Sequence, residues 1–323
     1  MNKRCLLVAS ALLAAGLVPA QAEFKPTKTI ELVVHGGPGS GNDVLARALI
    51  NIIDQEKLSP VRLQVANKVG GGSTTAAAYM VSKQGDPYVI AVYTIVWVTD
   101  PLTQEEAHNR LQMMTPIARM MEEPALVAVR TESPFKTMQD FIAAAKEKPG
   151  ELKQSGGSIT SRDNIVRQLL MKITGARWSF IPFAAGGERI AALLGGHSDM
   201  MIMDPSEASE QVRAGKLRII AQVGEKRLSG FENAPTLKEA GFNLPDVPQT
   251  RGIVGPPAMP PDAVAYYEDF FEKVTKTAGW QKFLTDNQLQ GIYTKSAETK
   301  AFLDQYENQV RDILKEAGAK VVR

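Results

Sequence analysis

A glycine-rich turn that occurs four times, each time after a β-type run and before a helix-type run, is the feature that most limits the fold. The turns occupy residues 36–41, 70–72, 155–158 and 184–187. Strands that alternate with helices are typical of α/β proteins, in which helices connect the strands of a sheet. The sequence therefore predicts an α/β protein in which four helices begin directly after a glycine turn.

The strand and helix signals form two similar blocks. The strand candidates lie at 29–34, 61–66 and 88–94 in the first block and at 125–129, 178–182, 200–203 and 217–223 in the second. Apolar residues at helical spacing follow several of these strands. The 323 residues also exceed what one hydrophobic core usually serves. We therefore predict two Rossmann-like lobes with a ligand cleft between them, with lobe 1 comprising residues 23–122 and 224–323 and lobe 2 residues 123–223.

The first 22 residues predict export. Lys3 and Arg4 precede an apolar run at 6–18, and residues 20–22 supply the small-x-small pattern of a signal-peptide cleavage site. The run is shorter than the roughly 20 apolar residues of a membrane span. We expect cleavage after Ala22 and a soluble protein in a bacterial-type periplasm. The one cysteine, Cys5, lies in this leader, so a disulfide scaffold is excluded for the mature chain.

The placement of the glycine turns favours anion binding. The N-terminus of a helix carries unpaired N–H groups and the positive end of the helix dipole, and glycine lets a ligand approach that backbone closely. An ordinary connection between strand and helix also uses glycine, so one such turn alone is weak evidence. Four turns in corresponding positions favour a shared anion site.

Two nucleotide motifs can be tested directly against the first turn, and both fail. A P-loop needs Lys-Ser/Thr after its last glycine, whereas Gly41 is followed by Asn42 and Asp43. A dinucleotide fingerprint needs a glycine at position 42. The predicted ligand is therefore a small anion, most simply a carboxylate.

Charge and motif content exclude several other functions. A net charge of +2 offers no electrostatic attraction to nucleic acid or to an anionic membrane. His108 and His197 have no metal-ligand spacing, and no nucleophile elbow occurs, so we predict no metal, no cofactor and no enzymatic activity. Asp199 and Asp204 form a conceivable acid–base pair, but capping or solvated carboxylates are more common.

Several segments, in order along the chain, carry a resemblance to a known family. They are the first turn with Arg47, Asn67 with residues 70–72, residues 83–87, residues 155–158 with Asp163, residues 182–187, residues 193–196 and residues 234–241. Together they resemble the substrate-binding proteins of tripartite tricarboxylate transporters, also called the Bug family. The match covers nearly the whole mature chain.

The resemblance implies a fold, a ligand and partners. The fold would be a type II-like periplasmic binding protein, a monomer that closes over a di-, tri- or aromatic carboxylate and delivers it to membrane permease subunits. Carried over by position, the ligand contacts would come from Gly37, Gly39, Asn42, Gly71, Gly72, Ser73, Thr74, Ser155, Gly157, Ser158, Ser161, Ala185, Gly186, Gly187 and Asp204. Asp43 would organise the first turn. The chain departs from the family at His35, where proline is usual, and at residues 184–185.

Some alternatives stay open at this point. His35 is either a sensor of the bound acid or a residue at the end of a strand whose ring nitrogens are hydrogen-bonded within the protein. Trp97 and Tyr93 either stack on an aromatic ligand or pack in the core, and Arg47 pairs either with an anion or with the protein. A role as ligand-sensing accessory to a membrane signalling protein, or as a periplasmic enzyme acting on a carboxylate, is the alternative to transport.

Overall fold

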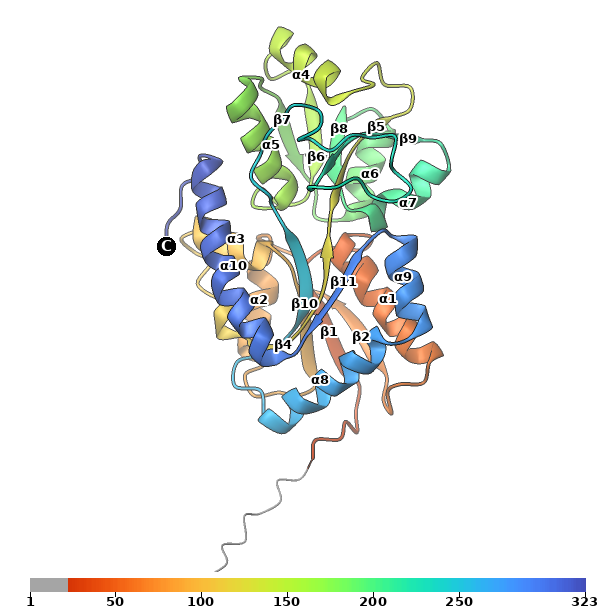
Figure 1. Ribbon diagram of the computed structural model, residues 1–323. Coiled ribbons are helices and arrows are strands. Elements are labelled where there is room, and N and C mark those ends of the chain that lie inside the picture. The colour runs from red at the N-terminus through yellow and green to blue at the C-terminus, as the bar shows by residue number, and fades with distance from the viewer. Residues whose placement is uncertain (1–22) are drawn as a thin grey trace, which may run out of the picture.

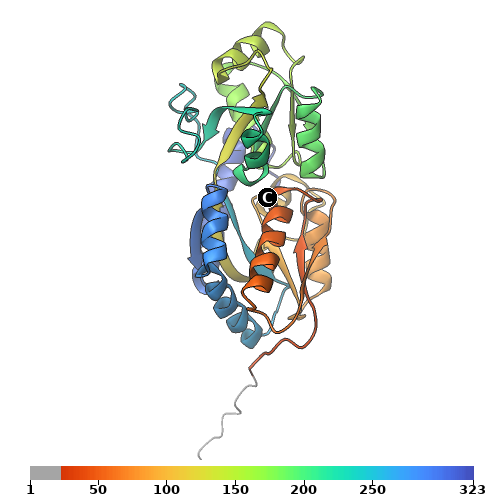
Figure 2. The ribbon, with the colours of Figure 1, turned by 90° about the vertical axis from the view of Figure 1, so that its right-hand side faces the viewer.

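Two β-sheets organise the molecule, one in each of two lobes that lie end to end (Figures 1 and 2). In this computed structural model the described residues are 23–323. The predicted signal peptide, residues 1–22, lies outside them. The prediction of a two-lobed α/β fold is confirmed.

The first sheet has the strand order β11-β4-β10-β3-β1-β2. Its strands are β1 (Ile30–Val34), β2 (Leu63–Asn67), β3 (Val89–Tyr93), β4 (Thr115–Glu123), β10 (Gln249–Gly255) and β11 (Gln290–Thr294). β1 pairs in parallel with β2 and β3, because the chain returns through a helix each time, whereas β10 is antiparallel to β3 and β4. β3 is buried along its whole length, as expected for a central strand covered on both faces.

Helices cover both faces of this sheet. They are α1 (Gly41–Gln55), α2 (Thr74–Ser82), α3 (Val96–Thr103), the short 3-10 helix η1 (Leu111–Met113), α8 (Pro261–Thr275), α9 (Ala278–Asp286) and α10 (Ser296–Glu316). The apolar stripe of α1, with Leu45, Leu49 and Ile53 fully buried, packs in one core with Leu32 and Ile90 of the sheet. This stripe sets the orientation of α1, so that its N-terminus faces the second lobe (Figure 1).

The second sheet has the order β7-β6-β8-β5-β9. Its elements are β5 (Ala125–Arg130), α4 (Met138–Glu147), β6 (Lys153–Gly156), α5 (Arg162–Thr174), β7 (Ser179–Pro182), α6 (Gly186–Leu194), β8 (Met200–Met203), α7 (Pro205–Arg213) and β9 (Leu217–Val223). β6 runs parallel to β7 and β8, and β5 runs antiparallel to β8 and β9. α5 and α6 therefore begin at the carboxyl ends of β6 and β7, where the glycine turns lie.

Two chain crossings connect the sheets: Pro124 separates β4 from β5, and residues 224–248 separate β9 from β10. The sequence-based boundary assigned all of residues 224–248 to lobe 1. In the structure, the side-chain nitrogen Nε2 of Gln222 in β9 donates to the carbonyls of Phe231 and Ala234, at 2.8 and 2.7 Å. Phe231 also packs in the lobe 2 core. Because this segment packs against β9, we propose that lobe 2 extends to about residue 248.

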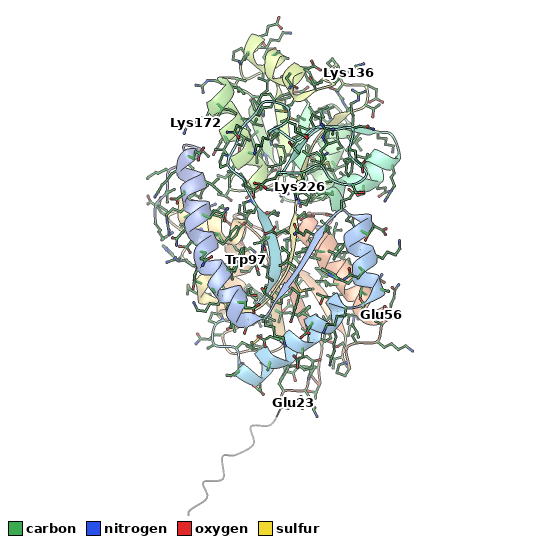
Figure 3. All side chains as sticks on the ribbon, viewed as in Figure 1. Glu23, Glu56, Trp97, Lys136, Lys172 and Lys226 are labelled. Carbon is green, nitrogen blue, oxygen red and sulfur yellow. The ribbon has the colours of Figure 1, made fainter. Side chains whose placement is uncertain are left out.

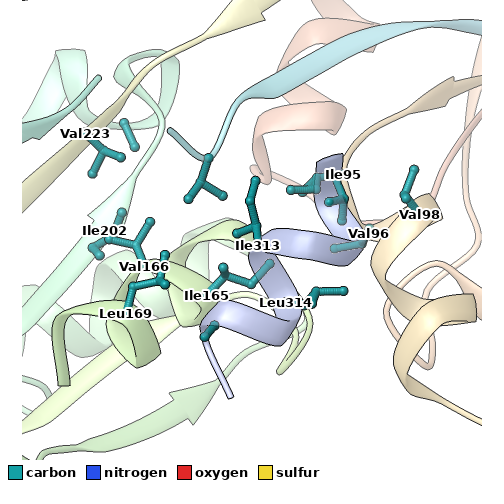
Figure 4. Packing of buried hydrophobic residues seen from close by; sticks show 14 of the residues in the cluster. Ile95, Val96, Val98, Ile165, Val166, Leu169, Ile202, Val223, Ile313 and Leu314 are labelled. Atoms are coloured by element: carbon teal, nitrogen blue, oxygen red, sulfur yellow. The ribbon is translucent and has the colours of Figure 1, made fainter. Parts of the chain in front are cut away.

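The end of α10 adds a third connection. Ile313 and Leu314 of α10 lie in one apolar cluster with Ile165 and Leu169 of α5 (Figure 4). Lys172 Nζ donates to the carbonyl of Glu316 at 2.7 Å. Apolar contact thus continues from one lobe into the other, and the same cluster includes Leu237, Phe242 and Val247 of the 224–248 segment.

Side chains follow the usual distribution of polarity. Trp97 is 1% exposed and lies inside lobe 1, whereas Glu56, Lys136 and Lys172 lie at the periphery (Figure 3). Within residues 23–323, none of the helices combines the length and the apolar character needed to cross a bilayer.

Candidate functional site

One cavity of about 270 Å³ lies between the lobes and receives residues from all four glycine turns. The first turn contributes Gly36 and residues 40–42, the second residues 70–72, the third residues 157–158, and the fourth Ala184 and Gly186. His35, Val69, Ile95, Phe183, Ile202 and Met203 add further wall, much of it apolar. Turns that are far apart in the sequence therefore line one shared cavity.

The first turn is organised by the carboxylate of Asp43. Its Oδ2 accepts from the Gly39 amide at 3.0 Å and from Arg47 Nε at 2.9 Å, and its Oδ1 accepts from Asn67 Nδ2 at 2.9 Å. Burial opposes ionisation of Asp43, but the hydrogen bonds from Arg47, Asn67 and Gly39 outweigh it and hold the pKa of Asp43 below its usual value. Arg47 thus pairs with the protein. The amides of residues 41–43, at the start of α1, meet no acceptor within residues 23–323.

The second turn holds one of the protein's own carboxylates. Asp100 of α3 accepts hydrogen bonds from the amide of Ser73 and, at 2.6 Å, from its hydroxyl. Gly72 has a φ of +69° and passes so close to Asp100 that a side chain at this position would overlap the carboxylate. Because burial dominates, the pKa of Asp100 is raised to about 6. Sequence reasoning missed Asp100, which lies 27 residues after Ser73.

The third turn is arranged in the same way by Asp163. The Gly157 amide donates to Asp163 Oδ2 at 2.8 Å, and Ser161 Oγ donates to Asp163 Oδ1. Ser158 Oγ lies 2.8 Å from Thr160 Oγ1. Thr160 in turn donates to Asp100 of the other lobe, and its carbonyl accepts from Thr99 Oγ1 at 2.8 Å. This side of the cavity is therefore closed by hydrogen bonds that meet at Thr160.

The fourth turn contacts the first. The Gly37 amide donates to the carbonyl of Ala184 at 2.9 Å, and Gly186 approaches the backbone of Gly39 so closely that a Cβ would overlap its carbonyl oxygen. The Gly37–Ala185 bridge engages the Gly186 amide, whereas the amides of Gly187 and Glu188 in the first turn of α6 meet no acceptor within residues 23–323. The N-termini of α1 and α6 therefore approach the cavity from opposite lobes.

The predicted site residues, with Asp43 included, divide evenly between the cavity wall and the layer behind it. Those on the wall are Asn42, Gly71, Gly72, Gly157, Ser158, Ser161, Gly186 and Asp204. Those outside the wall are Gly37, Gly39, Asp43, Ser73, Thr74, Ser155, Ala185 and Gly187. Ser73 is held by Asp100, and Ser155 is fully buried with its hydroxyl donating to the carbonyl of Arg189 at 3.2 Å.

Three arginines on the wall were missed by the sequence reasoning. Arg251 of β10 binds Glu123 and Asp204, and Arg162 of α5 also binds Asp204. Arg189 of α6 binds Glu207 and lies 3.9 Å from Asp163. No local motif marks these arginines, because their partners lie at distant positions in the chain.

The acidic partners respond differently to burial. Burial would raise the pKa of Asp204, but the charges of Arg251 and Arg162 outweigh it, so the pKa is lowered and Asp204 is a partner of arginine. Burial raises the pKa of Glu123 to about 7 despite its contact with Arg251. Asp204 also begins α7, where its amide donates to Glu207 Oε2 at 3.3 Å. Asp204 thus forms ion pairs at the start of a helix. This favours a structural role for Asp204 over the acid–base role considered from the sequence.

The aromatic candidates are core residues with one polar contact. Tyr93 and Trp97 are buried, and Trp97 Nε1 donates to His35 Nδ1 at 3.1 Å. His35 itself lies on the cavity wall at the end of β1. Burial, followed by the charge of Arg251, lowers the pKa of His35 to about 3, so the ring is neutral at physiological pH.

A family model described as the tripartite tricarboxylate transporter family receptor matches residues 46–319. The chain belongs to this receptor family. The UPF0065 protein in the gbd 5' region of Cupriavidus necator is 30% identical to this receptor, over 97% of this chain and 95% of the relative. The family assignment agrees with the resemblance found in the sequence.

Solved structures show that the receptor shares its fold with periplasmic binding proteins. The periplasmic binding protein BugD has a TM-score of 0.85 and 19% identity, covering 91% of this chain and 99% of BugD. An R. palustris protein with adipate has a TM-score of 0.84 and 20% identity, covering 91% of this chain and 98% of the other. MatC from Rhodopseudomonas palustris, with bound malate, has a TM-score of 0.79 and 20% identity, covering 90% and 99%.

Proposed function

We propose that this receptor captures a small organic acid between its lobes in the periplasm and delivers it to membrane permease subunits. The observation that carries the proposal is the single cavity to which all four glycine turns contribute. The free amides at the start of α1 and α6 approach it from opposite lobes, and helix N-termini favour anions. A carboxylate at this point satisfies donors that the protein itself leaves open.

The size of the cavity suits a small acid. A volume of about 270 Å³ lies at the lower end of the range for small-molecule sites. The adipate and malate complexes of proteins with the same fold support acids of four to six carbons as first candidates. The apolar wall, with Ile95, Phe183 and Ile202, suits the carbon skeleton of such an acid.

Capture requires that the lobes separate and close again. The lobes touch at Gly37 and Ala184 and at Asp100 and Thr160, so the cavity is enclosed on two sides. A ligand favours the closed form only through contacts that it makes better there, and the amides from both lobes supply such contacts. The closed surface is then what the permease recognises.

The state of the acidic side chains supports binding without turnover. Asp163, Asp204 and Glu207 on the wall are each engaged by an arginine or by backbone and hydroxyl donors. None of the three is free to act as a general base, so we assign no enzymatic activity. The predicted leader and the family of periplasmic receptors together support export to the periplasm, where we propose that the protein acts as a monomer.

Isothermal titration calorimetry tests the proposal. Protein is unfolded and refolded to remove any bound ligand, and is then titrated with malate, succinate, adipate, citrate and benzoate. We expect binding of at least one acid in the micromolar range or tighter, with the corresponding methyl ester binding at least about tenfold more weakly because it loses its charge. Absence of binding to the whole panel contradicts the proposal.

A further inference from the structure

The ring of His35 is fixed in one tautomer by its neighbours. Trp97 Nε1 and Asn42 Nδ2 lie 3.1 and 2.8 Å from His35 Nδ1. An indole nitrogen only donates, so Nδ1 must be the acceptor and carries no proton. The neutral ring therefore carries its proton on Nε2.

The proton on Nε2 has no acceptor within residues 23–323. In the orientation that the structure gives Asn42, Nδ2 lies 3.4 Å from His35 Nε2 and Oδ1 lies 2.6 Å from Ser40 Oγ, so the group that faces His35 is itself a donor. The single proton of the Ser40 hydroxyl also lies within reach of the Gly37 carbonyl, at 2.7 Å. His35 lies on the cavity wall. The nearby Arg251, whose charge is shared with Glu123 and Asp204, and burial of the ring both oppose protonation of Nδ1. His35 thus offers one neutral N–H donor.

The carboxylates on the cavity wall are already engaged by donors of the protein. Each of the six oxygens of Asp163, Asp204 and Glu207 accepts from a donor of the protein. Arg189 also lies on the wall, and its Nε is buried without a hydrogen-bond partner within residues 23–323. A positive charge on the ligand would therefore have to share a carboxylate that donors of the protein already engage.

We propose that His35 is a specificity-determining residue: its Nε2–H donates to an oxygen of the bound acid, and the site selects hydroxy, keto and unsubstituted carboxylic acids over α-amino acids. The inference rests on the proposed function and names the ligand class within it. An ammonium group brings donors alone, so at His35 two donors oppose each other and its charge lies near that of Arg251. Gln249 also lines the cavity, and its side-chain amide offers both a donor and an acceptor. It therefore does not discriminate between an α-hydroxy acid and an α-amino acid.

The ligand class is tested with pairs of acids that share a carbon skeleton. Malate is compared with aspartate, and adipate with 2-aminoadipate, by calorimetric titration of the refolded full-length mature protein. We expect the amino acid of each pair to bind at least about tenfold more weakly, the usual cost of an unmet donor. Equal or tighter binding of the amino acids overturns the inference, although the proposed function stands. Absence of binding to every acid contradicts both.

Two variants separate the donor from the structural role of the ring. In His35→Asn the amide oxygen replaces Nδ1 as acceptor for Trp97, but nothing replaces Nε2–H. In His35→Gln the amide nitrogen reaches approximately the position of Nε2. We expect His35→Asn to bind malate about tenfold more weakly and to lose part of its preference over aspartate, with His35→Gln within about threefold of wild type. Wild-type affinity in His35→Asn overturns the inference.

A direct measurement on the wild-type protein remains decisive if a variant fails to fold. ¹⁵N NMR of the labelled imidazole reports which ring nitrogen carries the proton. We expect an unprotonated Nδ1 in the free protein and a displaced Nε2–H resonance after addition of malate. A protonated Nδ1, or an Nε2–H resonance that does not move when malate binds, overturns the inference.

Discussion

Two of the contacts between the lobes, the glycine contact and the Asp100 contact, differ in chemistry. In the glycine contact, the first and fourth turns meet through their backbones, with Gly37 bonded to Ala184 and Gly186 against Gly39. In the Asp100 contact, a buried carboxylate of lobe 1 accepts from Thr160 of lobe 2. The first contact depends on the absence of a side chain, and the second on a particular side chain.

The difference explains why similar glycine turns end in different roles. The turns before α1 and α6 leave helix amides open at the cavity, whereas the amide of Ser73 before α2 is taken by Asp100. The same local geometry therefore serves a ligand in one place and an internal carboxylate in another. The experiments below treat the two contacts separately.

The glycine contact is broken most strongly by Gly186→Ala. A methyl group there overlaps the carbonyl of Gly39 and disfavours the closed form, so we expect the Kd for the best-bound acid to rise about 100-fold, or about 2.7 kcal/mol. Gly187→Ala is the matched control, because no atom lies within contact distance of its Cβ position. Calorimetry gives the affinities and thermal unfolding checks the fold. Equal losses of affinity in Gly186→Ala and Gly187→Ala contradict the role assigned to Gly186 in the glycine contact.

The carboxylates that hold the first and second turns, Asp43 and Asp100, should change the stability of the folded protein in opposite directions as pH rises. The pKa of Asp100 is raised to about 6, so ionisation of Asp100 destabilises the folded protein as pH rises from about 4 to 6. The pKa of Asp43 is lowered, so its contribution to stability is present above its usual pKa and is lost as pH falls below it.

Denaturant unfolding of Asp100→Asn and Asp43→Asn between pH 3 and 7 measures this difference. Relative to wild type, Asp100→Asn should gain roughly 2–3 kcal/mol of unfolding free energy between pH 4 and pH 7, because it removes a buried charge. Asp43→Asn should remain at a constant deficit above pH 4, and the deficit should shrink at lower pH. Parallel profiles for the two variants exclude the proposed difference.

A smaller effect is expected for Thr160→Val, which removes the hydroxyl that donates to Asp100 and keeps the size of the side chain. Loss of one hydrogen bond between the lobes should weaken ligand binding about fivefold, or about 1 kcal/mol. Thr131→Val is the control, since the Thr131 hydroxyl donates to the carbonyl of Gly215 within lobe 2, at 2.7 Å. Unchanged affinity in Thr160→Val would mean that the Asp100 contact does not contribute to closure.

Parts of the fold were predictable because their patterns are local. The strand–turn–helix order around each glycine turn follows from residues within about ten positions of each other, and the two-lobed fold is confirmed. α3 was missed because residues 96–102 are all buried, so it shows no amphipathic period, and it contains Pro101. β10 was missed because Gln249, Thr250 and Arg251 read as polar, although every residue of the strand is buried.

The candidate site was predictable to the same extent. The prediction placed the four turns around one space, and residues of each turn lie on its wall. It missed Arg162, Arg189 and Arg251, and it did not predict that both oxygens of Asp204, which lies on the wall, bind arginine. The expectation of neutral donors alone therefore omitted a layer of paired charges behind them.

The sequence by itself determined where the helices begin, where the backbone is free of side chains and which family the chain resembles, because periodicity, glycine placement and ordered motifs are properties of neighbouring residues. Only the tertiary structure decided which amides stay open, since that depends on carboxylates brought from elsewhere: Asp100 reaches Ser73 across 27 positions, and Asp204 reaches Arg251 across 47. Such contacts depend on how the helices pack against the sheets. This packing decides whether a buried N–H group finds an acceptor in the protein or remains available to a ligand.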